Sequence, residues 1–346
     1  MAIGLLAVVD VVGLVVADLI ATLSVAYDHA LRLRRAALVL TEEHKARIEA
    51  ALRSAYPAKN TRRAYLAGWK QWLEWAVEHG VRALPAAPSL VATYLMERAA
   101  SGKAPATVRL YRSAIGAAHR AMEAVDPTAT ERVRQVLRSI GAEHGDRGRG
   151  QVQGLGWEAV ERIAALAEQS GSLVGLRNGA LFRLGSDALL RVSELASLMV
   201  SDLQVLPDGS AALTVPRSKT DQDGRGHVRY LGKETVEAVL RYMQAAGVQS
   251  GTLFRALHHG TVHERLGVRS IRRIITHWAT VAGVEGRVSG HSPRVGAVES
   301  LIAAGASVLE VQQSGDWKSP EMPAYYGRHL LPERGAVARL RYGVAA

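Results

Sequence analysis

The chain has 346 residues, of which 43 are Lys or Arg and 32 are Asp or Glu, and its formal net charge is +11. This length is enough for two domains that each bury a core, which excludes a single small binding module. The chain has no cysteine, so disulfides, thiolate zinc sites and a thiol nucleophile are excluded. The basic excess suits a polyanionic partner, with nucleic acid expected before an anionic membrane.

Residues 1–40 form an apolar extension without net charge. The stretch from Ile3 to Tyr27 is about as long as a membrane span, but Asp10 and Asp18 interrupt it, and each costs about 2.5–3.5 kcal/mol at the centre of a span. A secretory signal would require a Lys or Arg before this stretch, and none precedes it. Three interpretations stay open: an amphipathic or poorly ordered extension, an upstream segment read from too early a start codon, and a membrane anchor. We expect a cytoplasmic protein without a membrane partner.

Residues 41–140 hold 16 basic and 9 acidic side chains and are expected to form a bundle of four or five helices that contacts DNA. The helix expected over 60–79 repeats Tyr65, Trp69, Trp72 and Ala76 at spacings of three and four, which predicts an aromatic stripe in the core. Further helices are expected over 89–100, 105–124 and 128–140. Five basic residues near helix starts or on polar faces are candidate DNA contacts: Arg62, Arg63, Lys103, Arg109 and Arg112.

Residues 141–156 are rich in glycine among polar residues, which is typical of a flexible connector, and we place the domain boundary there. Residues 157–346 begin with helices expected over 157–169 and 176–199. Two β-rich runs at 211–216 and 227–231 then flank a polar turn and predict a hairpin. Helical patterns resume near 235, over 269–282 and after 292, so the fold class is mainly α with a small β-hairpin or sheet. His258, His259 and His263 lack an obvious carboxylate to orient them, so no metal site is expected.

Breaking a phosphodiester without a metal requires a nucleophile, cationic or hydrogen-bonding groups on the phosphate oxygens, and an acid for the leaving 5′-hydroxyl. Ser292 and Pro293 predict a helix start, where His291 and Arg294 meet free backbone N–H groups that favour an anion. An ordinary surface pair at a helix start is the alternative.

Arg191 and Glu194 are expected one turn apart within a largely buried helix. The carboxylate could hold the guanidinium so that its remaining donors face a phosphate, or the two could form a simple internal salt bridge. Tyr325 and Tyr326 follow Trp317 on a helix expected to begin near Pro320, and this pair alone indicates nothing about catalysis.

Taken together, these segments resemble the tyrosine recombinase (phage integrase) family, in its Cre-like branch, from about residue 41 to residue 342. The strongest stretch runs over 289–297 and continues through 315–317 to 326–328, with 190–195 and 217–220 before it in the family's order. The resemblance implies a core-binding domain at 41–140, a linker at 141–156 and a catalytic domain with a tail helix at 157–346.

The resemblance also implies the site residues. Arg191 becomes the first catalytic arginine with Glu194 as its supporting carboxylate, and Lys219 becomes the general acid on the hairpin. His291 and Arg294 become the second phosphate-binding pair, and Trp317 takes the position that His or Trp occupies. Tyr326 becomes the nucleophile because it lies nine residues after Trp317, although a shift of one residue would select Tyr325.

The activity implied is site-specific recombination of double-stranded DNA through a 3′-phosphotyrosine intermediate, by a homotetramer on specific recombination sites and without a metal or other cofactor. The two domains would clamp DNA from opposite sides, and a tail helix within 330–342 would dock on a neighbouring subunit or on its own domain. Type IB topoisomerase-like relaxation and a non-cleaving DNA-binding regulator are the alternative functions.

Overall fold

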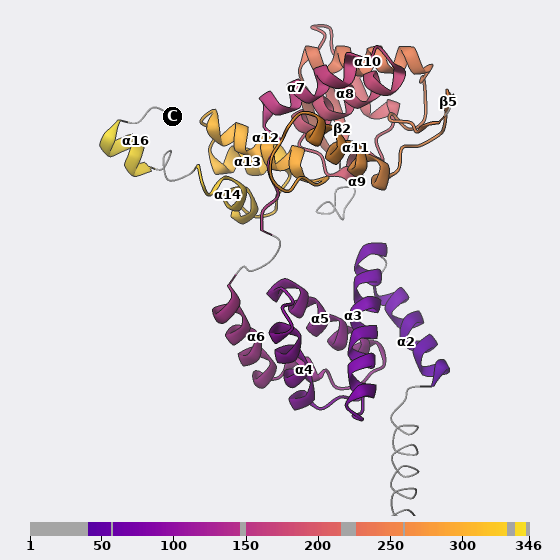
Figure 1. Ribbon diagram of the computed structural model, residues 1–346, viewed down its shortest axis with the longest axis vertical. Helices are drawn as coiled ribbons and strands as arrows, with labels where there is room; N and C mark the ends of the chain where they lie inside the picture. Colours follow the sequence, from indigo (N-terminus) through magenta and orange to yellow (C-terminus); the bar gives the residue numbers. More distant parts are fainter. Residues whose placement is uncertain are drawn as a thin grey trace, which may run out of the picture. The chain divides into compact units, whose positions relative to one another are not determined.

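The computed structural model describes residues 41–56, 58–145, 150–215, 226–258, 260–330 and 336–343. The apolar extension 1–40 and the segment 216–225, which contains Lys219, lie outside the described residues. The chain divides into two compact units, Met1–Gly150 and Gln151–Ala346. The helices of each unit are labelled in Figure 1. Within the described ranges, no helix is long and apolar enough to cross a membrane.

The described part of the first unit is a bundle of five α-helices. They are α2 (Glu42–Ala55), α3 (Lys59–Glu78), α4 (Pro88–Ala100), α5 (Pro105–Ala121) and α6 (Glu131–His144), with the short 3-10 helix η1 (Pro127–Ala129) before α6. Helices α4 and α5 begin with proline in the first turn, where the missing N–H costs nothing.

The expected aromatic stripe of α3 is confirmed as core. Trp69 and Trp72 are buried, and the ring of Trp72 packs edge-on against Tyr94 of α4 with the centroids 5.2 Å apart. The Trp72 indole N–H donates to the carbonyl of Ala83 at 3.0 Å, so this large buried side chain also has its polar atom satisfied.

The connector is shorter than the glycine content of 141–156 predicts. Helix α6 continues through His144, so residues 141–144 belong to the bundle. Residues 151–156 run along the second unit, where the N–H groups of Gln153 and Leu155 donate to the carbonyls of Arg287 and Ser292 at 2.9 Å each. These backbone bonds order the second half of the glycine-rich stretch, which composition alone does not reveal.

A buried histidine makes the first unit sensitive to acid. His119 of α5 has no exposed surface, its Nε2 accepts from the N–H of Ala86 at 2.9 Å, and its Nδ1 donates to the carbonyl of Ile115 at 2.8 Å. Burial lowers the pKa of His119 below its ordinary value, because the charged ring would have to leave water. We expect the contribution of His119 to the free energy of unfolding to be complete above about pH 6.5 and to fall by up to about 1.4 kcal/mol per pH unit below it, since the unfolded chain binds the proton more tightly.

Urea unfolding of the full chain at several pH values, followed by tryptophan fluorescence, measures this loss. In His119→Gln the side-chain amide can still bond to Ala86 but does not titrate, so the pH dependence of the variant should be flatter than that of the parent. Equal slopes in parent and variant would show that another group is responsible.

The described part of the second unit is mainly helical, with one three-stranded and one two-stranded sheet. Its helices are α7 (Trp157–Glu168), α8 (Leu173–Asp187), α9 (Val192–Leu195), η2 (Val200–Asp202), α10 (Lys233–Ala246), α11 (Val268–Val281), α12 (Ser292–Ala303), α13 (Val308–Gly315), α14 (Glu321–Gly327) and α16 (Ala336–Tyr342). Its strands are β1 (Leu203–Val205), β2 (Ala211–Val215), β3 (His227–Leu231), β4 (Leu257–His258) and β5 (Thr261–Val262).

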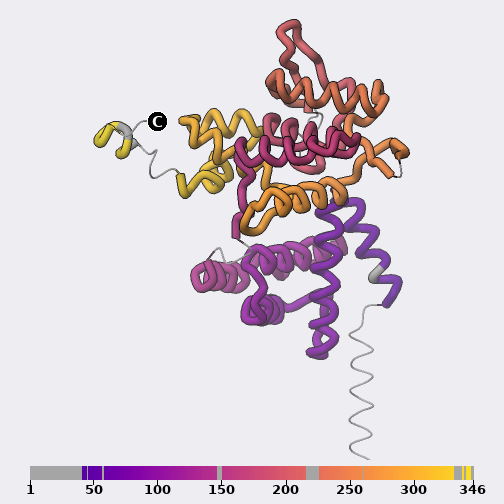
Figure 2. Tube along the Cα trace, turned by 45° about the horizontal axis from the view of Figure 1, so that its top comes forward, coloured from indigo at the N-terminus to yellow at the C-terminus, as the bar shows by residue number. Residues whose placement is uncertain are grey.

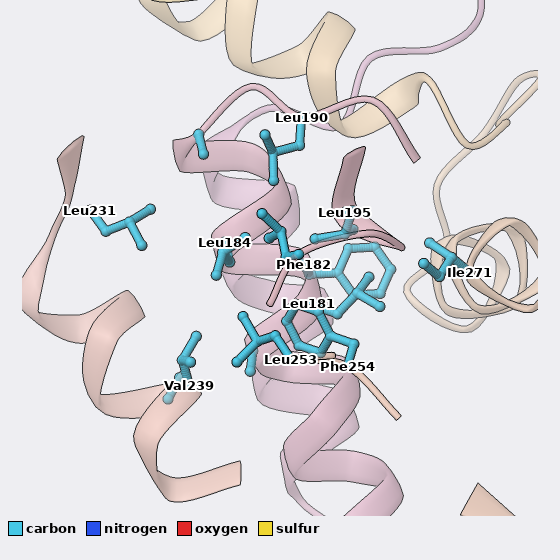
Figure 3. Packing of buried hydrophobic residues seen from close by; sticks show 14 of the residues in the cluster. Leu181, Phe182, Leu184, Leu190, Leu195, Leu231, Val239, Leu253, Phe254 and Ile271 are labelled. Atoms are coloured by element: carbon cyan, nitrogen blue, oxygen red, sulfur yellow. The ribbon is translucent and has the colours of Figure 1, made fainter. Parts of the chain in front are cut away.

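Helix α8 is the centre of this unit, because residues on all its faces are buried. It packs against α7 and α10, and Figure 3 shows Leu181, Phe182 and Leu184 of α8 among side chains from α10, α11 and β3. In the views of Figures 1 and 2, α12, α13 and α14 gather at the end of the unit away from β4 and β5. That end carries a smaller core, which includes Val295, Ile302 and Tyr326.

The predicted hairpin is confirmed as strands β2 and β3, which pair antiparallel with Ala211 opposite Leu231 and Val215 opposite His227. A third strand, β1, extends it to a sheet of order β1-β2-β3. Side chains at alternate positions of β2 are buried, as expected for a sheet with one face on the core.

The tail helix α16 does not bury the apolar residues that its sequence offers. Val337, Leu340 and Tyr342 are all exposed. Of the two expectations for this segment, packing on its own domain is therefore not observed for these three side chains.

Candidate active site

The sequence context predicts that Arg191 lies within a continuous helix, and this prediction is wrong. Helix α8 ends at Asp187, and the N–H groups of Leu189 and Leu190 return to the carbonyls of Ser186 and Gly185 at 3.0 Å each, the bonding pattern of a Schellman turn. Leu189 takes a φ of +49°, which costs a non-glycine residue about 1–2 kcal/mol. The break lets Arg191 stand at the N-terminus of the short helix α9.

Glu194 holds Arg191 in place through both carboxylate oxygens. One oxygen accepts from the backbone N–H of Arg191 at 2.8 Å, and the other accepts from its guanidinium at 2.6 Å. The side chain of Glu194 is 7% exposed and that of Arg191 is 22% exposed. The guanidinium is thus fixed at one corner and keeps an accessible side for a ligand.

The predicted helix start at residues 291–294 is confirmed as the N-terminus of α12, with His291 as its N-cap residue. Gly296, one turn further, has no room for a side chain, because a Cβ would lie 2.0 Å from the carbonyl carbon of Leu155. This close approach lets the 151–156 segment lie on α12 and support the first turn of the helix.

Arg294, in the first turn of α12, connects this helix to two other segments of the chain. Its side chain is 2% exposed, and its guanidinium donates to the carbonyls of Leu189 and Gly315. The carbonyl of Leu189, in the turn with the positive φ, therefore accepts a hydrogen bond from Arg294. The guanidinium carbon also lies 4.0 Å from the ring centroid of Trp317, a cation–π contact.

Trp317 follows the end of α13, whose last residue is Gly315. A Cβ on Gly315 would lie 1.7 Å from the indole, so only glycine leaves space for the ring. Asp316, with a φ of +55°, then reverses the chain, and its carboxylate lies 3.1 Å from Nε2 of His227 on β3.

Tyr326 meets His291 in this cluster, and Tyr325 does not. The hydroxyl of Tyr326 lies 2.8 Å from Nε2 of His291, and its ring packs edge-on against Trp317 with the centroids 6.1 Å apart. The ring of Tyr325 instead lies under the guanidinium of Arg328, 4.0 Å from its carbon. Successive residues of a helix point about 100° apart, so only one of two adjacent tyrosines can face His291.

The charges of the cluster favour an anion. Burial, followed by the nearby charges of Arg294 and Arg191, lowers the pKa of His291 to about 4, so the imidazole is neutral at pH 7. Burial raises the pKa of Tyr326, and the two arginines partly oppose this effect. Burial and the charge of Arg191 also lower the pKa of Arg294. A bound phosphate would offset the repulsion between the two guanidinium groups.

Six of the residues inferred from the sequence thus come together: Arg191, Glu194, His291, Arg294, Trp317 and Tyr326. The seventh, Lys219, lies outside the described residues. Of the candidate DNA contacts in the first unit, Arg63, Lys103 and Arg109 are exposed and Arg62 is half-buried. Arg112 is partly committed to structure, because its guanidinium donates to the carbonyl of Thr128 at 3.2 Å.

Two basic features were not singled out from the sequence. Helix α11 is strongly amphipathic, with Ile271, Ile275 and Ala279 buried. Its exposed side carries Arg269, Arg272, Arg273 and His277. The four-residue spacing of the apolar residues is a signal that could have found this face. The second feature, Arg229 on β3, gives no such signal, because its neighbours come from distant segments.

Residues 155–332 match the model of the phage integrase family. The chain belongs to this family. That match includes every residue of the cluster, and the family's name agrees with the resemblance inferred from the motifs.

Two curated relatives are each 27% identical to this phage integrase family member. The recombinase cre of Escherichia phage P1 aligns over 301 residues, which cover 82% of this chain and 88% of the relative. An integrase/recombinase xerD homolog of Selenomonas ruminantium aligns over 281 residues, covering 78% and 81%. The alignments extend beyond the matched family model to the helical bundle.

Solved structures show the same fold. The XerH site-specific recombinase in a post-cleavage complex with a palindromic difH substrate has a TM-score of 0.62 at 16% identity, over 80% of this chain and 79% of that one. A lambda integrase dimer bound to a COC′ core site has a TM-score of 0.56 at 18% identity, over 84% and 77%. Both support the mainly helical fold with a small antiparallel sheet.

Proposed function

We propose that this phage integrase family member is a site-specific DNA recombinase that cleaves and rejoins DNA through a 3′-phosphotyrosine bond formed by Tyr326. The observation that carries the proposal is the 2.8 Å contact between the Tyr326 hydroxyl and His291, beside two arginines. The relatives named recombinase and integrase support the same activity. A DNA substrate also agrees with action in the cytoplasm.

Each residue has a role that follows from its contacts. With its proton on Nδ1, neutral His291 accepts the hydroxyl proton of Tyr326 through Nε2 as the tyrosine oxygen attacks phosphorus. Arg191 and Arg294 neutralise the charge that develops on the non-bridging oxygens. Trp317 covers Arg294 and keeps water from its buried guanidinium.

The bond between phosphorus and the 5′-oxygen breaks as the bond to Tyr326 forms. Lys219 on the segment between β2 and β3 supplies the proton to that leaving oxygen. Attack of a 5′-hydroxyl on the phosphotyrosine bond reverses the step, so the energy of the linkage is retained and no nucleotide is needed. Rejoining to the partner strand gives recombination.

A homotetramer on two recombination sites would carry out this exchange. The exposed apolar side chains of α16 agree with docking on a neighbouring subunit, since they are not covered by their own unit. Residues 41–140 would act as the core-binding domain, and the exposed arginines of α11 would contact phosphates.

The activity is tested with one DNA molecule that carries two copies of a site selected by the protein from a random-sequence pool. Recombination predicts deletion or inversion between the two sites. Relaxation of supercoils without either product would support the type IB topoisomerase-like alternative. Binding without any cleavage would support the regulator.

DNA binding by this protein should weaken steeply with salt. Exposed Arg63, Lys103 and Arg109 of the bundle and the arginines of α11 would displace counterions from phosphates. If six to ten phosphates are contacted, the affinity should fall by about 10³–10⁵ between 50 and 200 mM salt. Fluorescence anisotropy with a labelled duplex measures this, and a flat response would contradict the role assigned to the basic residues.

A further inference from the structure

Strand β3 carries a basic residue on the face where an apolar one is expected. Exposed Val228 and Tyr230 alternate with the less exposed His227, Arg229 and Leu231. Arg229 lies opposite Leu213 of β2, which is fully buried, as is its neighbour on that face, Ala211. The strand therefore directs a guanidinium to the inner side of the sheet.

On this side β3 contacts the end of α13, the turn that also binds Arg294. The Arg229 guanidinium donates to the carbonyl of Gln313 at 3.4 Å, a long contact, and His227 pairs with Asp316 at 3.1 Å. Two residues after Gln313, the carbonyl of Gly315 accepts from Arg294. Arg229 and Arg294 are thus bound to the same turn.

The carboxylates around Arg229 compensate its positive charge only in part. Glu194 already accepts from Arg191 through both oxygens. Asp316 lies 3.1 Å from Nε2 of His227, which offsets the charge of the carboxylate only when the imidazole is protonated. The buried Nε of Arg229 meets no hydrogen-bond partner within the described ranges. Burial lowers the pKa of Arg229, and the charge of Arg191 acts in the same direction, while Asp316 and Glu194 oppose it.

Three guanidinium groups, those of Arg191, Arg229 and Arg294, therefore share two carboxylates, Glu194 and Asp316. Half-burying a third cation is costly unless an anion completes the cluster. An aliphatic side chain such as that of Leu231 would fill the same face of the sheet without this cost.

We propose that Arg229 is a third arginine of the phosphate site and binds a DNA phosphate through the terminal nitrogens of its guanidinium. This proposal rests on the recombinase function proposed above, because the phosphate is that of the DNA held for cleavage. Arg229 adds to the positive charge that Arg191 and Arg294 supply. It lies on β3, the strand that follows the segment containing Lys219 in the sequence.

The test uses the full chain and a duplex that it selects from a random-sequence pool. Arg229→Gln should lower the slope of log affinity against log salt by about 0.9, the contribution of one phosphate contact. It should also slow formation of the covalent adduct by roughly 10²-fold. Arg229→Lys, which keeps the charge without the forked donors, should retain the slope and recover part of the rate.

A second duplex carries a single uncharged methylphosphonate at the cleaved linkage or at one of its two neighbours. At the phosphate that Arg229 binds, this change should remove the difference in slope between the parent and Arg229→Gln. The matched control is Arg241→Gln on α10, whose side chain is 58% exposed and lies 3.7 Å from Glu168. It should leave both slope and rate unchanged.

Three results would overturn the proposal: an unchanged slope and rate in Arg229→Gln, an equal loss in Arg241→Gln, or a slower adduct with an unchanged slope and no recovery in Arg229→Lys. The last would make Arg229 a structural residue only. Failure of the parent to form an adduct with any selected duplex counts against the recombinase function, whereas the salt slope tests Arg229 independently.

Discussion

Replacing Tyr326 with phenylalanine should abolish covalent attachment of the protein to DNA while leaving DNA binding close to that of the parent. The substitution removes only the hydroxyl oxygen that lies 2.8 Å from His291. The ring remains packed against Trp317 and is 8% exposed in the parent. Loss of one hydrogen bond should lower the free energy of unfolding by about 1 kcal/mol, so the variant should fold.

A duplex with a nick or a phosphorothiolate at the cleaved linkage traps the phosphotyrosine bond, which is read as a shift on a denaturing gel. Tyr325→Phe is the matched control and should still form the adduct, because its ring faces Arg328 and not His291. An adduct in Tyr326→Phe but not in Tyr325→Phe would move the nucleophile by one residue. Adducts in both would remove the tyrosine assignment altogether.

Local patterns in the sequence predict much of the fold, because they report local physics. The spacing of Trp69, Trp72 and Ala76 identifies a core face of α3, and Ser292 with Pro293 identifies the start of α12. The alternating runs on either side of the polar turn identify β2 and β3. In each case residues close to one another in the sequence decide the local structure.

The break after α8 could not be predicted in this way. No glycine or proline marks residues 188–191, and the apolar pattern continues through them. Leu189 adopts its left-handed conformation in a turn whose carbonyl is bound by Arg294, a residue 105 positions away in the sequence. Tertiary contacts of this kind override local propensity.

The same limit applies to the site. The family resemblance names the residues that meet around Tyr326, but it provides neither the pairing of His227 with Asp316 nor the contact of Arg229 with Gln313. Those contacts join β3 to the end of α13, two elements that are far apart in the chain. Only the folded backbone brings their side chains together.

Replacing Arg191 with lysine should slow adduct formation by roughly 10²–10³-fold, the loss typical of removing one donor that stabilises charge in a transition state. Lysine keeps the positive charge near Glu194, but its single ammonium cannot bond the carboxylate and still present a second, fixed donor to a phosphate. Because Glu194 is nearly buried, this variant is preferable to alanine, which would leave the carboxylate uncompensated.

The measurement is the rate of adduct formation at saturating protein, with affinity determined separately for the same duplex. Arg241→Lys on α10 is the matched control, since Arg241 is an exposed arginine of the same unit that also lies beside a glutamate, and it should react at the parental rate. Glu194→Gln should slow the reaction less than Arg191→Lys, because the amide oxygen can still accept one of the two hydrogen bonds that Glu194 accepts from Arg191, the one from the guanidinium. If Arg191→Lys cleaves as fast as the parent while Glu194→Gln does not, the carboxylate acts on the reaction by another route, and the assignment of Arg191 to the phosphate must be abandoned.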